Sequence, residues 1–317
     1  MQQKILFLLG LLFSLNAPAQ TPFRFAVGSC ANYAGEEGDS IFRSIAADHP
    51  SFFFWLGDNV YYNKIDYASP AGMRKALQKR FNHPYVRQFL SDIPQRAIWD
   101  DHDYGPNDAD SQFVHAQASR KIFAQFWKAT PTQVGKYNDI RWVESQEGLV
   151  FIGLDDRSHR GPVGSHMLGV SQLHWLKSEL VKAADQGKTH VFIAVGSQVL
   201  NTAEVFENMS RFNDRSDFLA ILDVFPGRVI LLTGDRHHGE INLLERPHRA
   251  FPIVEITSSA LTSKLYSPSP KELEANQTLL KVVGGHQYTL IEVLPQDGKV
   301  QVTFKGRKGE ILHQDVF

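Results

Sequence analysis

The sequence predicts an α/β protein folded as a single domain. Short apolar runs, which indicate buried strands, alternate with longer stretches of helical periodicity through most of the chain. The chain has 317 residues, of which 43% are hydrophobic and 21% are charged, so it can form the core of one large enzyme domain. No internal repeat and no low-complexity linker divides it.

The first half of the chain alternates strands with helices. Its predicted strands are mostly continuous apolar runs, the pattern of strands buried on both faces. Its predicted helices carry apolar residues on one face. We expect strands over residues 23–28, 52–56 and 96–99, and helices over residues 40–47, 71–90 and 111–129.

The second half begins with the same alternation and ends differently. Toward the C-terminus the helical patterns stop, which predicts a meander of strands without intervening helices. The segment 262–279 contains Ser-Pro-Ser-Pro and is expected to be a loop. We expect strands over residues 149–154, 191–195, 229–232, 241–244, 253–256, 288–294 and 300–304, and a helix over 171–184.

The N-terminus has the pattern of a secretory leader. Lys4 supplies a positive charge, residues 5–15 form an apolar run, and the small residues at 17–19 resemble a cleavage site. The apolar run is too short to span a bilayer, and no second long apolar stretch follows. We therefore expect a signal peptide over 1–19, a mature domain over 20–317 and a periplasmic or secreted protein without a transmembrane segment. A buried N-terminal strand or helix is the alternative.

Charge and cysteine content limit the possible binding partners and exclude an intrachain disulfide. The formal net charge of -1 gives no general electrostatic basis for binding nucleic acid or an anionic membrane. Cys30 is the single cysteine, so no intrachain disulfide can form. In an oxidising compartment a lone thiol is expected to be either buried as a small hydrophobic side chain or bound to a ligand.

Small or polar residues follow at least six of the predicted strands. In open α/β sheets, ligand sites form beyond the carboxyl ends of the strands. These residues are therefore expected to meet at one edge of the sheet. They are Cys30, Asp58, Asp100 with Asp101, Asp155, Ser197 and Asp235.

The aspartates at these strand ends favour a cation site. Asp58, Asp101 and Asp235 would repel one another if they were buried together, unless they were protonated or bound to cations. Any one of them alone could be a turn former or a helix N-cap. The whole set, together with nearby histidines, is better explained by metal binding.

Three segments supply the metal-binding side chains. Residues 57–61 place a glycine before Asp58, and Tyr61 follows one helical turn later as a ligand suited to Fe(III) or simply as a packing residue. Residues 99–108 are rich in oxygen ligands, which suit Ca²⁺, Mg²⁺ or Mn²⁺ better than Zn²⁺. Residues 234–240 add an Asp-x-His pair, which is weak evidence alone and stronger at a strand end.

The order and spacing of five motifs resemble those of the PhoD-like metallophosphatases, the alkaline phosphatase D family. The resemblance extends from about Phe23 to Glu240. It implies a four-layer α/β/β/α metallophosphoesterase sandwich and a hydrolase acting on phosphomonoesters, phosphodiesters or both. The motifs are Gly28-Ser29-Cys30, Gly57-Asp58-Asn59-Val60-Tyr61, Trp99-Asp100-Asp101-His102-Asp103-Tyr104-Gly105-Pro106-Asn107-Asp108, Leu154-Asp155-Asp156-Arg157 and Gly234-Asp235-Arg236-His237-His238.

The same resemblance implies one Fe(III) with Ca²⁺ nearby, for which Mn²⁺, Mg²⁺ or Zn²⁺ could substitute. Cys30, Asp58 and Tyr61 match the iron-side ligands of the family, with His237 as their imidazole partner and Asp58 bridging the metals. The calcium-side candidates are Asp101, Asn107 and Asp235, and His102 takes the place of the histidine that acts near the leaving group.

Two departures from related enzymes stand out. Wider metallophosphoesterases begin with an Asp-x-His motif that is absent here, so Cys30 is expected to take its place. Many PhoD-like proteins also have an N-terminal β-sandwich domain, for which there is no room before Phe23. The chain is therefore expected to be the catalytic module alone.

The functional prediction is hydrolysis of small-molecule phosphate esters at a multinuclear metal site, with His102 as a catalytic residue. Arg157 or Arg160 could bind a non-bridging phosphoryl oxygen, or either could form a surface salt bridge. The alternative within this fold is a phosphodiesterase or phospholipase C-like enzyme. A protein that only binds metal or phosphate is the alternative from another class.

Overall fold

Two mixed β-sheets lie face to face in the computed structural model, which describes residues 21–32, 36–206 and 208–317. The predicted leader, residues 1–19, lies outside these ranges and remains a prediction. Within them, no helix has the length and apolar character needed to cross a membrane.

The first sheet has six strands and the second has seven. In spatial order the first contains β13 (Ile311–Val316), β12 (Val300–Gly306), β11 (Gln287–Val293), β1 (Phe23–Gly28), β2 (Phe53–Leu56) and β3 (Gln95–Ile98). The second contains β10 (Leu279–Val283), β8 (Gly239–Leu244), β9 (Ile253–Thr257), β7 (Arg228–Thr233), β6 (His190–Val195), β5 (Leu149–Gly153) and β4 (Trp142–Gln146).

Aromatic side chains fill the space between the sheets. The Phe25 ring of the first sheet lies 5.2 Å from the Phe151 ring and 5.0 Å from the Phe192 ring of the second, edge to face in both cases. Phe151 and Phe192 stack on each other at 5.3 Å. These rings come from the continuous apolar runs of the sequence, which are buried because both faces of their strands are covered.

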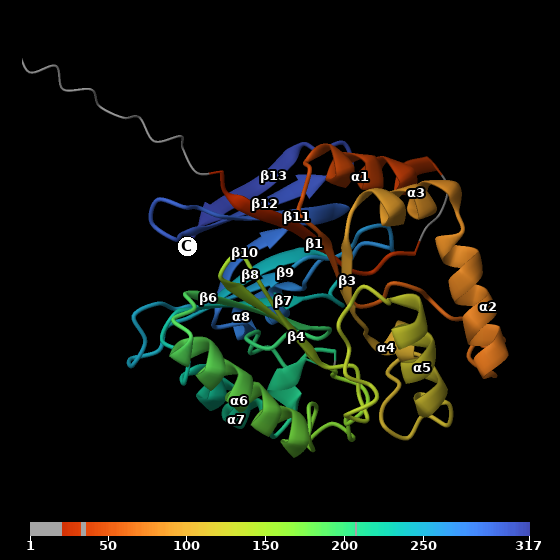
Figure 1. Ribbon diagram of the computed structural model, residues 1–317, viewed down its shortest axis with the longest axis horizontal. Coiled ribbons are helices and arrows are strands. Elements are labelled where there is room, and N and C mark those ends of the chain that lie inside the picture. Colours follow the sequence, from red (N-terminus) through yellow and green to blue (C-terminus); the bar gives the residue numbers. More distant parts are fainter. Residues whose placement is uncertain (1–20, 33–35, 207) are drawn as a thin grey trace, which may run out of the picture.

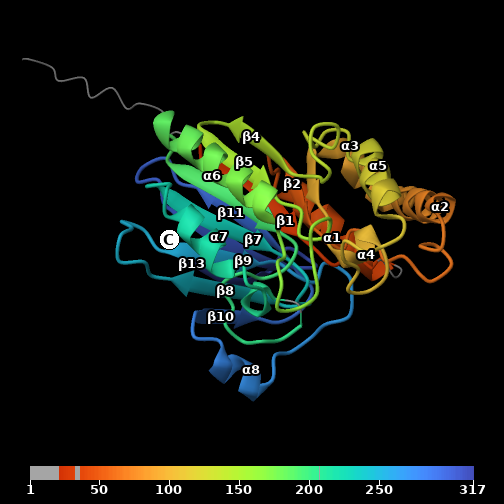
Figure 2. The ribbon, with the colours of Figure 1, turned by 90° about the horizontal axis from the view of Figure 1, so that it is seen from below.

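Helices cover the outer face of each sheet and complete four layers (Figure 1). Over the first sheet lie α1 (Glu36–Ala47) and α3 (Pro84–Asp92), where Phe42 packs on Phe89 at 4.9 Å. Over the second lie α6 (Val170–Asp185) and α7 (Arg215–Leu222), seen in front of the strands in Figure 2. The predicted α/β/β/α sandwich is therefore confirmed.

Several predicted elements need correction. The helix expected over 71–90 is two helices, α2 (Pro70–Phe81) and α3, because Pro84 lacks an N–H and disfavours helical geometry at the residue before it. The helix expected over 111–129 is confined to α5 (Ala116–Phe126). The loop expected over 262–279 contains α8 (Pro270–Ala275), so the C-terminal strands do have an intervening helix. The strands β4, β10 and β13 and the helix α7 were not expected.

Parallel strands bring the predicted site residues to one end of the molecule. β1, β2 and β3 run parallel in the first sheet, as do β5, β6, β7 and β9 in the second. The residues expected at one sheet edge come instead from two facing sheets, because β1 to β3 lie in the first sheet and β4 to β10 lie in the second.

Candidate metal centre

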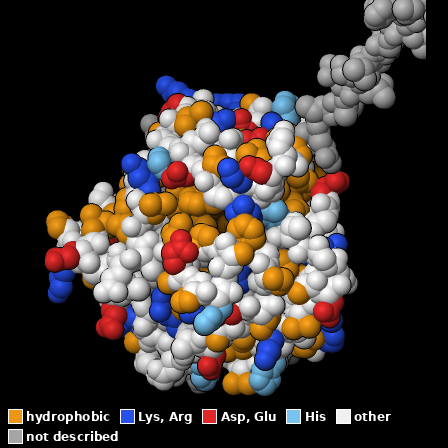
Figure 3. Space-filling view, turned by 90° about the vertical axis from the view of Figure 1, so that its left-hand side faces the viewer, with side chains coloured by type: hydrophobic (Ala, Val, Ile, Leu, Met, Phe, Trp, Pro, Cys, Tyr) orange, Lys and Arg blue, Asp and Glu red, His pale blue; other side chains and the backbone are white. Residues whose placement is uncertain are grey.

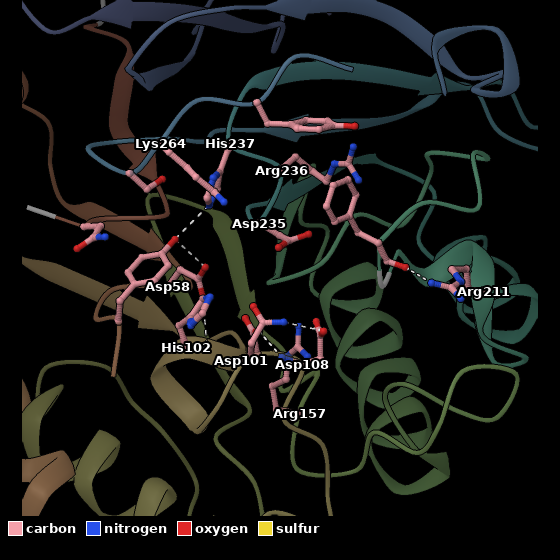
Figure 4. A pocket seen from close by; sticks show the side chains of 16 residues that line it. Asp58, Asp101, His102, Asp108, Arg157, Arg211, Asp235, Arg236, His237 and Lys264 are labelled. Atoms are coloured by element: carbon pink, nitrogen blue, oxygen red, sulfur yellow. Dashed lines mark hydrogen bonds between the residues drawn. The ribbon is translucent and has the colours of Figure 1, made fainter. Parts of the chain in front are cut away.

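A cavity of about 860 Å³ lies beyond the carboxyl ends of these strands (Figure 4). Its wall combines acidic, basic, imidazole and aromatic side chains, all from segments that follow strands of the two sheets. The lining residues are Asn32, Asp58, Tyr61, Asp101, His102, Asn107, Asp108, Arg157, Phe206, Arg211, Asp235, Arg236, His237, Ser263, Lys264 and Tyr266.

Four predicted iron-side ligands converge at one side of the cavity. The Tyr61 hydroxyl donates to Asp58 Oδ2 at 2.9 Å and lies 3.2 Å from His237 Nε2. The Cys30 thiol lies 3.7 Å from Asp58 Oδ2. One ligand atom from each of Cys30, Asp58 and His237 falls within 4.8 Å of the other two. The four side chains come from the loops after β1, β2 and β7, so only the tertiary fold can bring them together.

Left-handed backbone directs these side chains inward. Cys30, Asp58, Asp235 and His237 have φ values of 57°, 53°, 65° and 58°, and Gly57 has a φ of 96°. Such values are uncommon for residues other than glycine and are concentrated at functional sites. Each lies beyond a strand, where the chain turns sharply. The Asp58, Asp235 and His237 side chains line the cavity, whereas Cys30 is fully buried next to Asp58.

Asp101 and His102 form the second part of the cluster. They belong to the short helix α4 (Asp101–Tyr104) after β3, and a ligand atom from each lies within 4.8 Å of one from Asp58. The His102 backbone N–H donates to Asp58 Oδ1 at 3.3 Å, and its ring lies 4.3 Å from the Tyr61 ring. Asp101 Oδ2 accepts the Asp108 N–H at 2.7 Å, which fixes the carboxylate.

The other predicted site residues also line the cavity, with different surroundings. Asp235 faces it with a half-buried carboxylate. Asn107 is exposed, and its amide nitrogen donates to Asp108 Oδ2 at 2.7 Å. Arg157 is buried, and its Nε donates to Asp100 Oδ1 at 2.6 Å, so its ion pair is a buried one and not the surface salt bridge considered from the sequence. The functional roles of all three remain predictions.

Two strand-end residues have structural surroundings instead. Asp155 accepts hydrogen bonds from the Trp99 indole at 2.9 Å and from the Ile140 N–H at 3.0 Å. The Ser197 hydroxyl donates to Asp156 Oδ2 at 2.9 Å. Neither residue lines the cavity. They connect the strand ends to one another behind the site.

Burial and like charges set the protonation of the cluster. Burial and the neighbouring carboxylates raise the pKa of Asp58, and burial and Asp101 raise the pKa of Asp235. Burial alone would raise the pKa of Asp101, but the nearby Arg157 cation, with His102 and the hydrogen bond from the Asp108 N–H, outweighs burial and lowers it. Burial, Asp58 and Asp235 raise the pKa of the Cys30 thiol. Burial and the Lys264 ammonium lower the pKa of His237 to about 4, so its imidazole is neutral and able to bind a metal at neutral pH.

Solved structures share this arrangement of sheets and helices. The structure of PhoD superposes on the chain with a TM-score of 0.72 and 16% identity, over 94% of this chain and 69% of that one.

The chain has the metallophosphoesterase fold.

Two phosphatases of known structure have the same fold at similarly low identity. A purple acid phosphatase from yellow lupin (Lupinus luteus) seeds matches with a TM-score of 0.66 and 10% identity, over 95% of this chain and 54% of that one. A dimetal phosphatase from Danio rerio matches with a TM-score of 0.59 and 12% identity, over 94% and 99%. No protein-family profile matches the sequence, and no curated protein is detectably similar to it.

The donor set of the cavity fits metal cations. Three carboxylates, from Asp58, Asp101 and Asp235, share it, and the raised pKa values of Asp58 and Asp235 show that charging them without a counter-ion is unfavourable. Cys30, Tyr61 and His237 would hold one ion together with Asp58. Asp58, Asp101 and Asp235 would hold a second on the oxygen-rich side.

Much of the cavity wall was missed by sequence reasoning. The lining residues that were missed include Arg236, Ser263, Lys264, Tyr266 and, on the loop after β6, Phe206. Arg236 lies inside a recognised motif, between two predicted ligands, and could have been considered. The others lie in loops without a local pattern, and their positions depend on contacts between distant parts of the chain.

Proposed function

We propose that the chain is a metal-dependent phosphoesterase that hydrolyses phosphate esters of small molecules outside the cytoplasm. The convergence of Asp58, Tyr61 and His237 in one cavity of a metallophosphoesterase fold, with Cys30 buried against Asp58, supports the enzymatic part of this proposal. The N-terminal leader pattern supports the location. By resemblance, the metals are Fe(III) and Ca²⁺.

Side chains of the cavity can bind and orient the ester. Bound metal cations would supply Lewis acidity, withdrawing charge from the phosphoryl oxygens and favouring deprotonation of the attacking water. The Lys264 ammonium is exposed at the cavity next to His237 and can contact a phosphoryl oxygen (Figure 4). His102 faces the same space and can donate a proton to the leaving oxygen.

The distribution of charged side chains on the face shown in Figure 3 is consistent with a small-molecule substrate rather than a long polyanion. Acidic and basic side chains are interspersed over the face shown in Figure 3, without a continuous basic stripe. The basic residues at the cavity are instead placed around the acidic cluster, where a phosphate ester would bind.

Turnover of two model esters tests the proposal. The purified protein, loaded in turn with Fe(III) and Ca²⁺ or with Mn²⁺, Mg²⁺ or Zn²⁺, is assayed with p-nitrophenyl phosphate and with bis-p-nitrophenyl phosphate. We expect turnover of at least one ester, and the ratio of the two rates distinguishes a monoesterase from a diesterase. Asp58→Asn serves as the control that loses both. A fully metal-loaded protein inactive on both esters would contradict the proposal.

The identity of the metals has its own test. Elemental analysis of protein purified from its native compartment is combined with the visible spectrum. A phenolate–Fe(III) absorption band that disappears in Tyr61→Phe supports Tyr61 as an iron ligand. A colourless protein containing only zinc or calcium contradicts the iron assignment and leaves phosphoesterase activity to be decided by the assay above.

A further inference from the structure

An exposed phenylalanine lines the cavity on the loop after β6. The Phe206 side chain is 51% exposed, although it is a large aromatic residue. Its backbone φ of 48° lies in the left-handed region, which is unfavourable for a bulky residue. Strain that holds an apolar ring at the wall of a cavity is more typical of a binding site than of a passive surface loop.

Three contacts fix the Phe206 ring in this position. The Arg236 guanidinium lies 4.3 Å from the ring centroid, within the range of a cation–π interaction. The Tyr266 ring packs edge to face against it, with centroids 5.2 Å apart. Arg211 donates a hydrogen bond to the Phe206 carbonyl oxygen. We refer to Phe206, Arg236 and Tyr266 together as the aromatic platform.

Glu272 anchors the platform to the body of the protein. Its carboxylate forms a buried ion pair with Arg236 and accepts a hydrogen bond from the Tyr266 hydroxyl at 2.9 Å. Glu272 lies on α8, so the platform joins three separate segments: the loop after β6, the loop after β7, and the segment leading into α8. The platform is therefore pre-organised, which reduces the entropy lost when a ligand binds to it.

The platform lies within the same cavity as the metal-ligand cluster but on another side. Arg236 lies between Asp235 and His237 in sequence. In Figure 4, Arg236 and Arg211 lie on one side of Asp235, whereas Asp58 and His102 lie on the other. The cavity volume of about 860 Å³ is much larger than a phosphoryl group needs, so the organic part of an ester has room beside it.

The buried Arg236 guanidinium supports one face of the Phe206 ring. Its Nε and Nη1 atoms have no hydrogen-bond partner among the described residues, although the side chain is only 2% exposed. These two atoms have almost no accessible surface, so a ligand in the cavity would meet the exposed Phe206 ring and not the guanidinium N–H groups. A flat π system can stack or pack edge to face against that ring, and an alkyl chain cannot.

We propose that the aromatic platform binds a flat aromatic group of the substrate, so that aryl or heteroaryl phosphate esters are the preferred substrate class. This inference rests on the proposed phosphoesterase function and adds a specificity site to it. The metal-ligand cluster recognises the phosphoryl group of any ester, and Phe206 and Tyr266 distinguish the esters by their organic part.

Binding of two non-hydrolysable phosphonates tests the inference directly. Calorimetry compares phenylphosphonate with methylphosphonate on the metal-loaded protein and on Phe206→Ala, Phe206→Leu and the control Leu265→Ala. Leu265 is an exposed apolar residue of the same segment as Tyr266 and does not line the cavity. We expect Phe206→Ala to weaken phenylphosphonate about three- to tenfold, the size of an aromatic pair contact, and to change methylphosphonate less than about twofold. Phe206→Leu should recover only part of the loss.

Steady-state kinetics gives a second readout. In Phe206→Ala the KM for phenyl phosphate should rise by a similar factor, while the KM for ethyl phosphate and the kcat for both remain close to wild type. Equal effects on both ligands, or wild-type protein that does not prefer phenylphosphonate, would overturn the inference. If no ester is hydrolysed by any form of the protein, the phosphoesterase proposal fails, and the phosphonate comparison still decides whether the platform binds aromatic groups.

Discussion

At the scale of single residues, His102 has the position most directly suited to proton transfer. It lies one residue after Asp101 in α4, and its backbone N–H donates to Asp58 Oδ1 at 3.3 Å. Its side chain is half-buried, lines the cavity and stacks near Tyr61. The same position also brings a ring nitrogen near the carboxylates of Asp58 and Asp101, so a metal-ligand role must be distinguished from an acid role.

Replacement of His102 by alanine separates the two roles. If His102 protonates the leaving group, His102→Ala lowers kcat for p-nitrophenyl phosphate about 10²- to 10⁴-fold, the usual size of a general-acid contribution. The bound metal, measured by elemental analysis, should remain at the wild-type level. A simultaneous loss of metal would show that His102 is a ligand.

At the scale of elements, the turn between β2 and Asp58 depends on glycine. Gly57 has a φ of 96°, and a Cβ atom there would lie 2.7 Å from Asp100 Cβ and 2.9 Å from the Asp100 nitrogen. The close approach joins the ends of β2 and β3, which carry Asp58 and Asp101. A side chain at this position would push the two predicted ligands apart.

We expect Gly57→Ala to lower the free energy of unfolding by at least about 2 kcal/mol, because steric overlap adds to left-handed strain. Gly148→Ala is the matched control. Gly148 also has a positive φ, of 80°, but a methyl group added there would meet nothing within 4 Å, so only the conformational cost of about 1 kcal/mol applies. Urea denaturation measures both variants. Equal losses would show that the contact with Asp100 has no steric effect.

Glu255 on β9 gives the second sheet a pH-dependent stability. Its buried carboxylate accepts hydrogen bonds from the Leu200 N–H at 3.1 Å and the Asn242 amide at 3.2 Å. Burial raises the pKa of Glu255 from 4.5 to about 7. Between these two values the folded state keeps a proton that the unfolded state has lost, so stability is present at low pH and decreases as pH rises.

Glu255→Gln should remove this pH dependence. A pKa difference of this size corresponds to roughly 3 kcal/mol between pH 4.5 and 7. The wild-type free energy of unfolding should therefore fall more steeply over this range than that of the variant, as measured by urea denaturation at several pH values. Glu274→Gln, at an exposed position of α8, is the control. Parallel curves for wild type and Glu255→Gln would show that Glu255 is ionised in the folded protein at low pH.

At the scale of the whole molecule, the cavity joins the two sheets through mutually repelling groups. Asp58 and Asp101 follow strands of the first sheet, and Asp235 follows a strand of the second. Cations bound between them would attract both sets of carboxylates and hold the ends of the sheets together. Metal binding and the stability of the whole domain are therefore expected to be linked.

Removal of metal should lower the melting temperature. A cation present at about 100 times its dissociation constant stabilises the folded state by about 2.7 kcal/mol, and an excess of chelator removes that contribution. Calorimetric scans with cation and with chelator measure the difference. Asp235→Asn should reduce this difference in melting temperature, because the variant loses one carboxylate that attracts the cation. An unchanged melting temperature after verified metal removal would contradict the linkage.

The sequence by itself determined the local features of this protein. Continuous apolar runs identified β1, β2, β3, β5, β6 and β7, because that signal is contained in a few consecutive residues. The residues that follow these strands predicted the metal-ligand types in the same local way. The same reasoning placed Cys30, Asp58 and Asp235 at strand ends before their mutual distances were known. The helix break at Pro84 was also readable in the sequence and was overlooked.

Only the tertiary structure decided which strand ends share a cavity and what surrounds them. Asp58 and Asp235 meet across two sheets, Arg157 is paired with Asp100, and Asp155 and Ser197 are used behind the site. Phe206 and Tyr266 reach the cavity from loops without a periodic pattern. These features depend on contacts between residues far apart in the chain, and such contacts are fixed by the packing of complete sheets and helices, which no local pattern specifies.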